Sequence, residues 1–257
     1  PSVFGQSVTF TATVTGSSGT PSGTITFKNG LTTLGTGTLN GSGVATFSIS
    51  SLPVGSTYSI TAEYGGDVNF VTSTSSAVNQ VVNQASSATA LASSVNPSVF
   101  GESVTYTATV AATAPGAGTA TGSVEFFDGQ TSLGIVTLSS GFATSAAITN
   151  FGVSTHSITA VYSGDASFVT STSSPVSQVV NLGTANTPTF GTTTSTVDGF
   201  TVQISNYDAN FAYAGTATPI GAVVVISSNG LVTVTGVAAN TSSNSNITTT
   251  QTNYANG

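Results

Sequence analysis

The sequence predicts an all-β protein built from consecutive β-sandwich units. Apolar and polar residues alternate with a period of two through many short segments, which is typical of half-buried strands. No segment sustains the 3.6-residue period of an amphipathic helix. Gly, Pro, Asn and Asp separate the alternating segments at about the spacing that a sandwich requires.

A duplication indicates how the chain is divided. The segment PSVFGQSVTFTAT at residues 1–13 returns as PSVFGESVTYTAT at residues 97–109, and residues 62–83 return as residues 160–181. The two shifts, 96 and 98 residues, are about the size of one small domain. A residue that the fold needs should therefore occur in both copies. We predict three domains, at residues 1–84, 85–183 and 184–257.

The clearest predicted strands are the equivalent segments 8–14 and 104–110, in which Thr alternates with apolar side chains. The same pattern predicts strands at four further segments, residues 24–27, 58–64, 123–126 and 156–162. The pairs Asn29-Gly30 and Asp128-Gly129 predict hairpin turns of type I′.

One strand distinguishes the two copies. Residues 88–95 precede the second PSVFG motif and read as a leading edge strand, whereas nothing in the sequence precedes Pro1. Either the chain comes from a longer array, or another molecule donates the strand to the first copy. The sequence leaves both explanations open.

A third unit follows a short linker at residues 183–187. Its predicted strands are residues 200–205, 222–227, 231–234 and 246–251. We expect a small sandwich that is open or incomplete at its end, because the chain stops at residues 253–257, where another strand would follow.

The repeated motifs resemble the bacterial Ig-like repeats that occur in tandem in large secreted and surface proteins. The pattern comprises PSVFG-SVT-TAT, the segments GTITFKNG and GSVEFFDG (residues 23–30 and 122–129), and Tyr-x-Gly-Asp-x-x-Phe (residues 64–70 and 162–168). In the third unit, residues 199–211 and 230–243 resemble another β-rich repeat of bacterial secreted proteins. The resemblance implies tandem Ig-like sandwiches arranged as a rod, which serve as spacers, stalks or adhesive modules and carry no family-wide catalytic residues.

Composition argues against several kinds of partner. Charged residues make up 4% of the chain and Lys28 is the one basic residue, so nucleic acid is not expected to bind. No apolar run approaches the roughly 18 residues of a membrane span. Cys, Met and Trp are absent, so the chain has no disulfides, no metal thiolates and few oxidisable side chains. These features favour a durable protein that is secreted to the cell surface.

Comparison of the copies removes most candidate catalytic residues. His156, the one His, corresponds to Tyr58, which indicates a structural ring position rather than a base or metal ligand. Lys28 corresponds to Phe127, Glu63 to Val161, and Glu102 to Gln6, so none of these charges recurs. Nucleophilic and glycosidic catalysis both lack the required base or carboxylate pair, and we expect no enzyme activity and no cofactor.

Asp67 and Asp165 recur, each in a Tyr-x-Gly-Asp turn after a predicted strand. A calcium ligand is the weaker interpretation, because Ca²⁺ needs six to eight oxygens and each turn offers one carboxylate. We favour a structural role, in which the Asp accepts backbone N–H bonds while Tyr64 and Tyr162 tie down the corner, as in the Ig tyrosine corner.

Four further residues are singled out by their local pattern. Asp208 lies in a similar turn, for which we also predict a structural role. Asn40, Asn240 and Asn246 begin Asn-x-Ser/Thr triplets and are candidate glycosylation sites. The Thr-rich faces are candidates for O-linked sugar.

The sequence therefore predicts a non-catalytic extracellular protein with a structural role. One hypothesis is a subunit of a surface filament, sheath or stalk that assembles head to tail through its chain ends. The alternative is a set of spacer or adhesive repeats, with a glycan or other surface ligand, in a large bacterial adhesin or a secreted multidomain enzyme.

Overall fold

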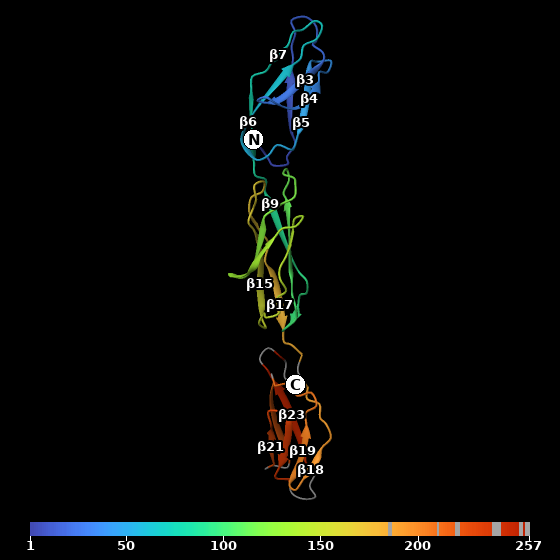
Figure 1. Cartoon of the computed structure of the whole chain (residues 1–257), viewed down its shortest axis with the longest axis vertical. Coiled ribbons are helices and arrows are strands. Elements are labelled where there is room, and N and C mark those ends of the chain that lie inside the picture. Colours follow the sequence, from blue (N-terminus) through green and yellow to red (C-terminus); the bar gives the residue numbers. More distant parts are fainter. Residues whose placement is uncertain (185–186, 210, 219–221, 238–242, 252–253, 255–257) are drawn as a thin grey trace. The chain divides into compact units, whose positions relative to one another are not determined.

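The computed structural model describes the chain except residues 185–186, 210, 219–221, 238–242, 252–253 and 255–257. The described residues form strands and no helix, which confirms the all-β prediction (Figure 1). The chain divides into two compact units. One contains residues 1–94, 105–146 and 157–177, and the other contains residues 95–104, 147–156 and 178–257.

The first sandwich is formed by residues 2–83. Its larger sheet has the strand order β1 (Ser2–Val3), β8 (Val78–Asn83), β6 (Gly55–Tyr64), β3 (Thr24–Asn29) and β4 (Thr32–Thr38), and β7 (Ser73–Thr74) pairs with β6. Its smaller sheet pairs β2 (Val8–Thr13) with β5 (Val44–Ile49). The core cluster joins both sheets, because Ile25 and Phe27 of β3 lie with Ala45 of β5, and Phe10 of β2 packs against them.

The second sandwich repeats this order with one additional strand. Its larger sheet is β10 (Ser98–Val99), β17 (Val176–Asn181), β15 (Thr155–Tyr162), β12 (Ser123–Asp128) and β13 (Thr131–Thr137), with β16 (Ser171–Thr172) paired to β15. Its smaller sheet is β14 (Phe142–Thr144), β11 (Tyr106–Ala112) and β9 (Ser87–Ser93). Thus the predicted leading strand is formed as β9, and β2 of the first sandwich has no such neighbour among the described strands.

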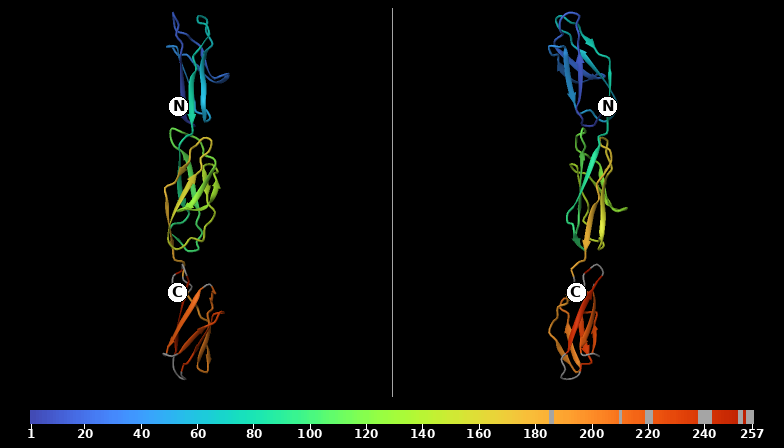
Figure 2. Two further views of the ribbon diagram at one scale, coloured as in Figure 1. Left: turned by 90° about the vertical axis from the view of Figure 1, so that its left-hand side faces the viewer. Right: turned by 180° about the vertical axis from the view of Figure 1, so that it is seen from behind.

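The third sandwich can be followed in orange and red in Figure 2. One sheet has the order β18 (Thr194–Thr196), β19 (Gly199–Gln203), β22 (Leu231–Thr235) and β21 (Val223–Ile226), and the other pairs β20 (Ala212–Thr218) with β23 (Asn244–Thr250). Strands β18 and β20 were not predicted, since β18 has no apolar residue and β20 is rich in Ala and Gly. Gly215 in β20 lies close to the core, and a Cβ there would be 2.5 Å from Ile247 Cδ1, so that side chain would have to shift to accept a larger residue.

The hairpin prediction was wrong by one residue. Asn29 pairs with Thr32, so Gly30 and Leu31 form the turn, and the backbone φ is positive at Gly30 but not at Leu31. A type I′ turn needs positive φ at both central residues and is therefore not formed. The equivalent turn after β12 is shifted in the same way, with Asp128 paired to Thr131.

Candidate functional sites

Both carboxylate oxygens of Asp165 accept hydrogen bonds, Oδ1 within its own turn and Oδ2 from the segment before β12. Its Oδ1 accepts hydrogen bonds from the backbone N–H of Ser167 at 2.7 Å and of Phe168 at 2.8 Å. Its Oδ2 accepts from the backbone N–H of Thr121 at 2.8 Å and from the Thr121 hydroxyl at 2.6 Å. Partial burial raises the pKa of Asp165, but these hydrogen bonds outweigh it and lower the pKa to about 2. The carboxylate therefore ties the turn after β15 to the segment before β12.

Asp67 is held in the same way in the first sandwich. Its Oδ1 accepts from the N–H groups of Asn69 and Phe70, both at 2.8 Å, and its Oδ2 accepts from the N–H and hydroxyl of Ser22 at 2.9 and 2.8 Å. The N–H groups of Asn69 and Ser22 hold the pKa of Asp67 well below its usual range. The groups around both carboxylates are N–H and O–H donors, which stabilise the negative charge of the carboxylate itself. A calcium ion would instead need further oxygen ligands. Among the described residues, no cluster of three or more His, Asp or Glu could hold a metal.

The two corner tyrosines differ in the hydrogen bonding of their hydroxyl groups. Both rings are buried, and Tyr64 donates a hydrogen bond to the carbonyl of Ser22 at 2.8 Å. The hydroxyl of Tyr162 makes no hydrogen bond within the described part of the chain. Burial, and then the negative charge of Asp165, raises the pKa of Tyr162 to about 12. The first copy thus has a buried corner tyrosine with its hydrogen bond. In the second copy the tyrosine ring is buried in the same way, but its hydroxyl makes no such bond.

The ring at position 156 contacts the loop that precedes its own strand. His156 Nε2 lies 3.0 Å from the carbonyl of Gly152 and 3.0 Å from Ser154 Oγ. A carbonyl can only accept, so Nε2 carries the proton and cannot serve as the base for Ser154. In the first copy Tyr58 donates from its hydroxyl to the carbonyl of Pro53 at 2.7 Å. Each of the two rings therefore binds a backbone carbonyl of the equivalent loop in its own sandwich.

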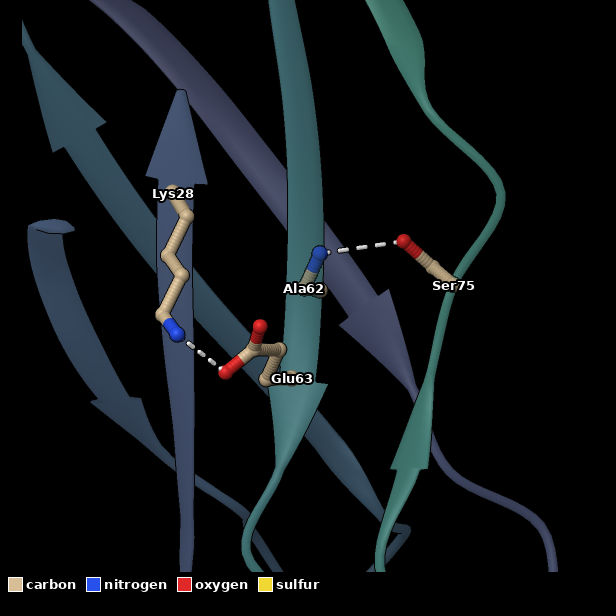
Figure 3. A network of polar contacts seen from close by, with 4 residues as sticks. All are labelled: Lys28, Ala62, Glu63 and Ser75. Atoms are coloured by element: carbon tan, nitrogen blue, oxygen red, sulfur yellow. Dashed lines mark hydrogen bonds and ion pairs between the residues drawn. The ribbon is translucent and has the colours of Figure 1, made fainter. Parts of the chain in front are cut away.

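Lys28 and Glu63 form an ion pair on neighbouring strands β3 and β6 (Figure 3). Lys28 Nζ lies 2.5 Å from Glu63 Oε2, and the same view shows the Ser75 hydroxyl accepting from the N–H of Ala62 at 3.0 Å. In the second copy both charges are replaced together, by Phe127 and Val161. This joint replacement is a signal in the sequence from which the contact could have been predicted.

Sequence reasoning missed a pair of side chains that recurs between the first and last strands of the larger sheet in both Ig-like sandwiches. Gln80 Nε2 donates to Ser2 Oγ at 2.9 Å, and Gln178 Nε2 donates to Ser98 Oγ at 3.2 Å. Ser2, Ser98 and Gln178 are buried. We call these pairs the Ser–Gln latch. Both members lie in the duplicated segments, so their recurrence was visible in the sequence, but their contact was not.

The turn that follows the serine of each latch is closed by a side-chain oxygen, which is neutral in the first copy and negatively charged in the second. Gln6 Oε1 accepts from the N–H of Val3 at 3.0 Å, and Glu102 Oε2 accepts from the N–H of Val99 at 2.9 Å. An amide oxygen and a carboxylate oxygen make the same bond here. The exchange of Gln for Glu therefore leaves the turn intact.

The remaining predicted residues lie apart from these sites. Asn40 is exposed, and its Oδ1 accepts from the N–H groups of Ser42 and Val44 in a turn. Asn246 is exposed on β23, whereas Asn240 lies outside the described residues. Asp208 accepts through its backbone carbonyl from the N–H of Phe211 at 3.1 Å, and its own N–H donates to the hydroxyl of Tyr213 at 2.9 Å.

A cleft of about 660 Å³ opens along the free edge of β2 in the first sandwich. Core side chains form its floor, strand β2 forms one wall, and the segment around β7 forms the other. We call it the β2 cleft, and it is lined by Thr9, Phe10, Thr11, Ala12, Thr13, Val14, Thr15, Ile25, Phe27, Ile60, Thr61, Ala62, Tyr64, Ser73, Thr74, Ser75, Ser76 and Val78. None of these side chains is charged.

The sequence of residues 1–83 and of residues 91–181 matches the model of the bacterial Ig-like domain (group 3). The chain belongs to this family. Members of this family are typically extracellular and non-catalytic, and the tandem arrangement fits structural or spacer repeats. No curated protein matches the chain. Among the described residues, no helix is long and apolar enough to cross a membrane.

Several solved structures match the chain at low sequence identity and with TM-scores below 0.5. Fibronectin(III)-like modules of Clostridium thermocellum CbhA are 18% identical over 70% of this chain and 86% of that chain, with a TM-score of 0.29. Titin domains A168–A170 are 11% identical over 99% of this chain and 90% of that chain, with a TM-score of 0.45. The mouse nectin-like molecule 4 ectodomain is 12% identical over 70% of this chain and 60% of that chain, with a TM-score of 0.31.

Proposed function

We propose that this Ig-like chain is a non-catalytic structural component of an extracellular surface filament, sheath or stalk. Its Ig-like sandwiches carry tension, and its chain ends make the assembly contacts. One observation carries the proposal, namely the parallel pairing of the first and last strands of the larger sheet, which is reinforced by the Ser–Gln latch in both sandwiches.

The two pairings have the same register. In the first sandwich β1 runs parallel to β8, with Ser2 opposite Val82, and the N–H of Phe4 donates to the carbonyl of Asn83 at 2.9 Å. In the second, β10 runs parallel to β17, with Ser98 opposite Val180. The N–H of Phe100 likewise donates to the carbonyl of Asn181 at 2.9 Å.

This arrangement determines how the hydrogen bonds are loaded. Because β1 and β8 are parallel, a pull on the start of β1 and the end of β8 acts along both strands in opposite directions. The bonds between them are then sheared together rather than opened one after another. The buried latch adds a side-chain bond across the same pair of strands, and each such bond stabilises by about 1 kcal/mol.

The composition supports a passive role outside the cell. Both oxygens of the recurrent carboxylates of Asp67 and Asp165 accept hydrogen bonds from groups of their own sandwich. The lack of Cys and Met limits chemical damage by oxidation.

The adhesin alternative would add a specific ligand, for which a glycan or matrix binding screen is the test.

Stretching single molecules between their two ends tests the load-bearing role. Replacing Gln178 with Ala should lower the unfolding force of the second sandwich and leave that of the first unchanged. Gln130→Ala is the matched control, because Gln130 lies exposed in the turn between β12 and β13, away from the latch. Equal forces for the Gln178→Ala and Gln130→Ala chains would contradict the proposal.

A further inference from the structure

Three Asn-Gly pairs occur among the described residues, and they begin at Asn29, Asn40 and Asn229. In such a pair the backbone nitrogen of the glycine can attack Cγ of the preceding side chain and release ammonia. Glycine permits the attack because it has no Cβ to hinder the approach and its backbone angles vary freely. The nitrogen must lose its proton in this step, so a glycine N–H that is bound to a carbonyl is protected. The hydrogen bonds of the three glycines therefore indicate which pair is reactive.

Two of the pairs are protected by hydrogen bonds. The N–H of Gly30 donates to the carbonyl of Ser59 at 3.2 Å, and the N–H of Ser59 donates back to Asn29 Oδ1 at 3.0 Å. The N–H of Gly230 donates to the carbonyl of Ser227 at 2.9 Å. Attack by either glycine nitrogen would first break its bond and leave the carbonyl unpaired. We therefore expect both pairs to react slowly.

The pair Asn40-Gly41 is not protected in this way. It lies in the turn between β4 and β5, and both residues are exposed. The N–H of Gly41 donates no hydrogen bond within the described part of the chain. A Cβ built on Gly41 would meet no atom within 4 Å, so the space beside the residue is open to water. The glycine nitrogen can therefore be deprotonated by solvent.

The hydrogen bonds of the Asn40 side chain favour the reaction. Its Oδ1 accepts from the N–H of Ser42 at 2.9 Å and of Val44 at 3.1 Å. Both donors withdraw electrons from Cγ, and they would stabilise the negative charge that develops on Oδ1 during the attack, as an oxyanion hole does. Nδ2, which leaves as ammonia, donates no hydrogen bond to the described residues. The turn thus binds the atom that becomes charged and leaves the departing group unbound.

The equivalent turn of the second sandwich contains no such pair. The N–H groups of Leu39 and Leu138, which precede the two turns, donate to the carbonyls of Gly23 and Gly122, both at 2.9 Å. Serines occupy residues 139–140 in the second turn. The turn therefore forms without an asparagine, and the reactive pair distinguishes the first sandwich from its copy.

We propose that Asn40 is a site of spontaneous chemical modification, at which the amide becomes an aspartate or an isoaspartate. The nitrogen of Gly41 forms a bond to Asn40 Cγ and gives its proton to water, while the bond from Cγ to Nδ2 breaks and Nδ2 takes up a proton and leaves as ammonia. The product is a cyclic imide. Water then opens the imide at either of its carbonyl groups, so the reaction consumes water, releases ammonia and needs no oxidant. The inference does not depend on the proposed structural role.

Each product changes the turn in a defined way. Both add a negative charge to a chain whose net charge is already −7. Aspartate keeps the side-chain oxygens to which Ser42 and Val44 donate. Isoaspartate instead routes the backbone through the former side chain, which lengthens the turn and displaces these bonds. A sugar on Nδ2 would need the nitrogen that this reaction releases, so modification and N-glycosylation of Asn40 exclude each other.

Ageing the whole chain in warm, mildly alkaline buffer tests the proposal. Digestion with pepsin, which does not need basic residues, gives peptides whose masses and isoaspartate content report each asparagine separately. We expect Asn40 to convert at least tenfold faster than Asn29 and Asn229 in the folded chain, and at nearly the same rate as both in denaturant. No conversion of Asn40, or equal rates at the three sites in the folded chain, would overturn the proposal. A tenfold difference that persists in denaturant would overturn it too.

A substitution of the glycine tests which nitrogen attacks. Gly41→Ala should preserve the fold, because the backbone φ of Gly41 is not positive and a Cβ there meets no atom within 4 Å. The added Cβ should slow the conversion of Asn40 at least tenfold by hindering the attack. Gly65→Ala is the matched control, since a Cβ on Gly65 is equally unhindered and the second copy has Ser163 there. It should leave the rate at Asn40 unchanged. An unchanged rate in a folded Gly41→Ala chain would rule out attack by this nitrogen, and the proposal with it.

Discussion

The two Ig-like sandwiches share their strand order and turn chemistry, yet they differ in how completely one sheet is covered. Tyr106 and Ala108 are fully buried in the second sandwich, while the equivalent Phe10 and Ala12 are half-buried in the first. The effect reaches the opposite wall, because Ser173 is buried and its counterpart Ser75 is exposed. One strand therefore determines how much of the core is closed, while the local turns form without it.

A second difference concerns residue identity at shared positions. Tyr58 and His156 each approach a carbonyl of the preceding loop, although their rings have different chemistry. Gln6 and its counterpart Glu102 accept the same backbone bond. What recurs at these positions is an interaction, and several side chains can supply it.

The largest expected effect on stability comes from removing a side chain that β9 covers. Tyr106→Ala should lower the free energy of unfolding of the second sandwich by about 3–5 kcal/mol, the range for a buried aromatic residue. Phe10→Ala should cost roughly half as much, because the Phe10 side chain is already partly exposed to water. Hydrogen exchange under denaturant measures each sandwich separately. Equal costs would show that the cleft is closed in solution.

The next effect tests whether the loss of β9 makes the second sandwich resemble the first. Leu91→Asp should cost about 2 kcal/mol, because it places a charge against Ala108. Amides of β11 should then exchange as fast as those of β2. Ala90→Asp, on the exposed face of the same strand, is the matched control and should change little.

The Ser–Gln latch should contribute more where it is more deeply buried. Gln178 is 0% exposed, so Gln178→Ala should cost about 1–2 kcal/mol by leaving Ser98 without this bond. Gln80 is half-buried, and Gln80→Ala should cost about half as much. Chemical denaturation of both variants gives the ratio, and a larger effect for Gln80 would contradict the comparison.

Asp165 should make the second sandwich sensitive to acid. Its pKa in the folded chain, about 2, lies below the ordinary value of 3.8, so the carboxylate stabilises the fold fully above about pH 4. This contribution is lost as the pH falls toward 2. Asp165→Asn should cost about 1 kcal/mol at pH 7, discounted for partial exposure to solvent, and should flatten the acid limb of the stability curve. An unchanged acid limb in the variant would assign the acid sensitivity to other groups.

The smallest effects are expected where the copies exchange residue types. The double variant Lys28→Phe, Glu63→Val gives the first copy the residues of the second and should change stability by less than about 0.5 kcal/mol, as exposed ion pairs contribute little. His156→Tyr should also leave the melting temperature and assembly nearly unchanged. A large loss in either variant would show that the copies are not interchangeable at these positions.

The sequence predicted much of this fold because its strands alternate cleanly and its motifs occur twice. The alternation at residues 8–14 predicted β2, and the recurrence of Asp67 and Asp165 directed attention to turns that the structure shows to be held by their carboxylates. It missed β20, where small residues at Gly215 and Ala217 carry little strand signal by themselves. It also misplaced the hairpin turns, because pairing with the partner strand determines which two residues are central.

The sequence by itself determined the family and the all-β class, since these depend on local patterns that a duplicated chain displays twice. The tertiary structure alone decided which distant residues meet. The contacts of Ser2 with Gln80 and of Lys28 with Glu63 join segments that are tens of residues apart, and strand register brings them together. The β2 cleft likewise brings β2 together with the distant segment around β7, a property of packing that no single stretch of sequence contains.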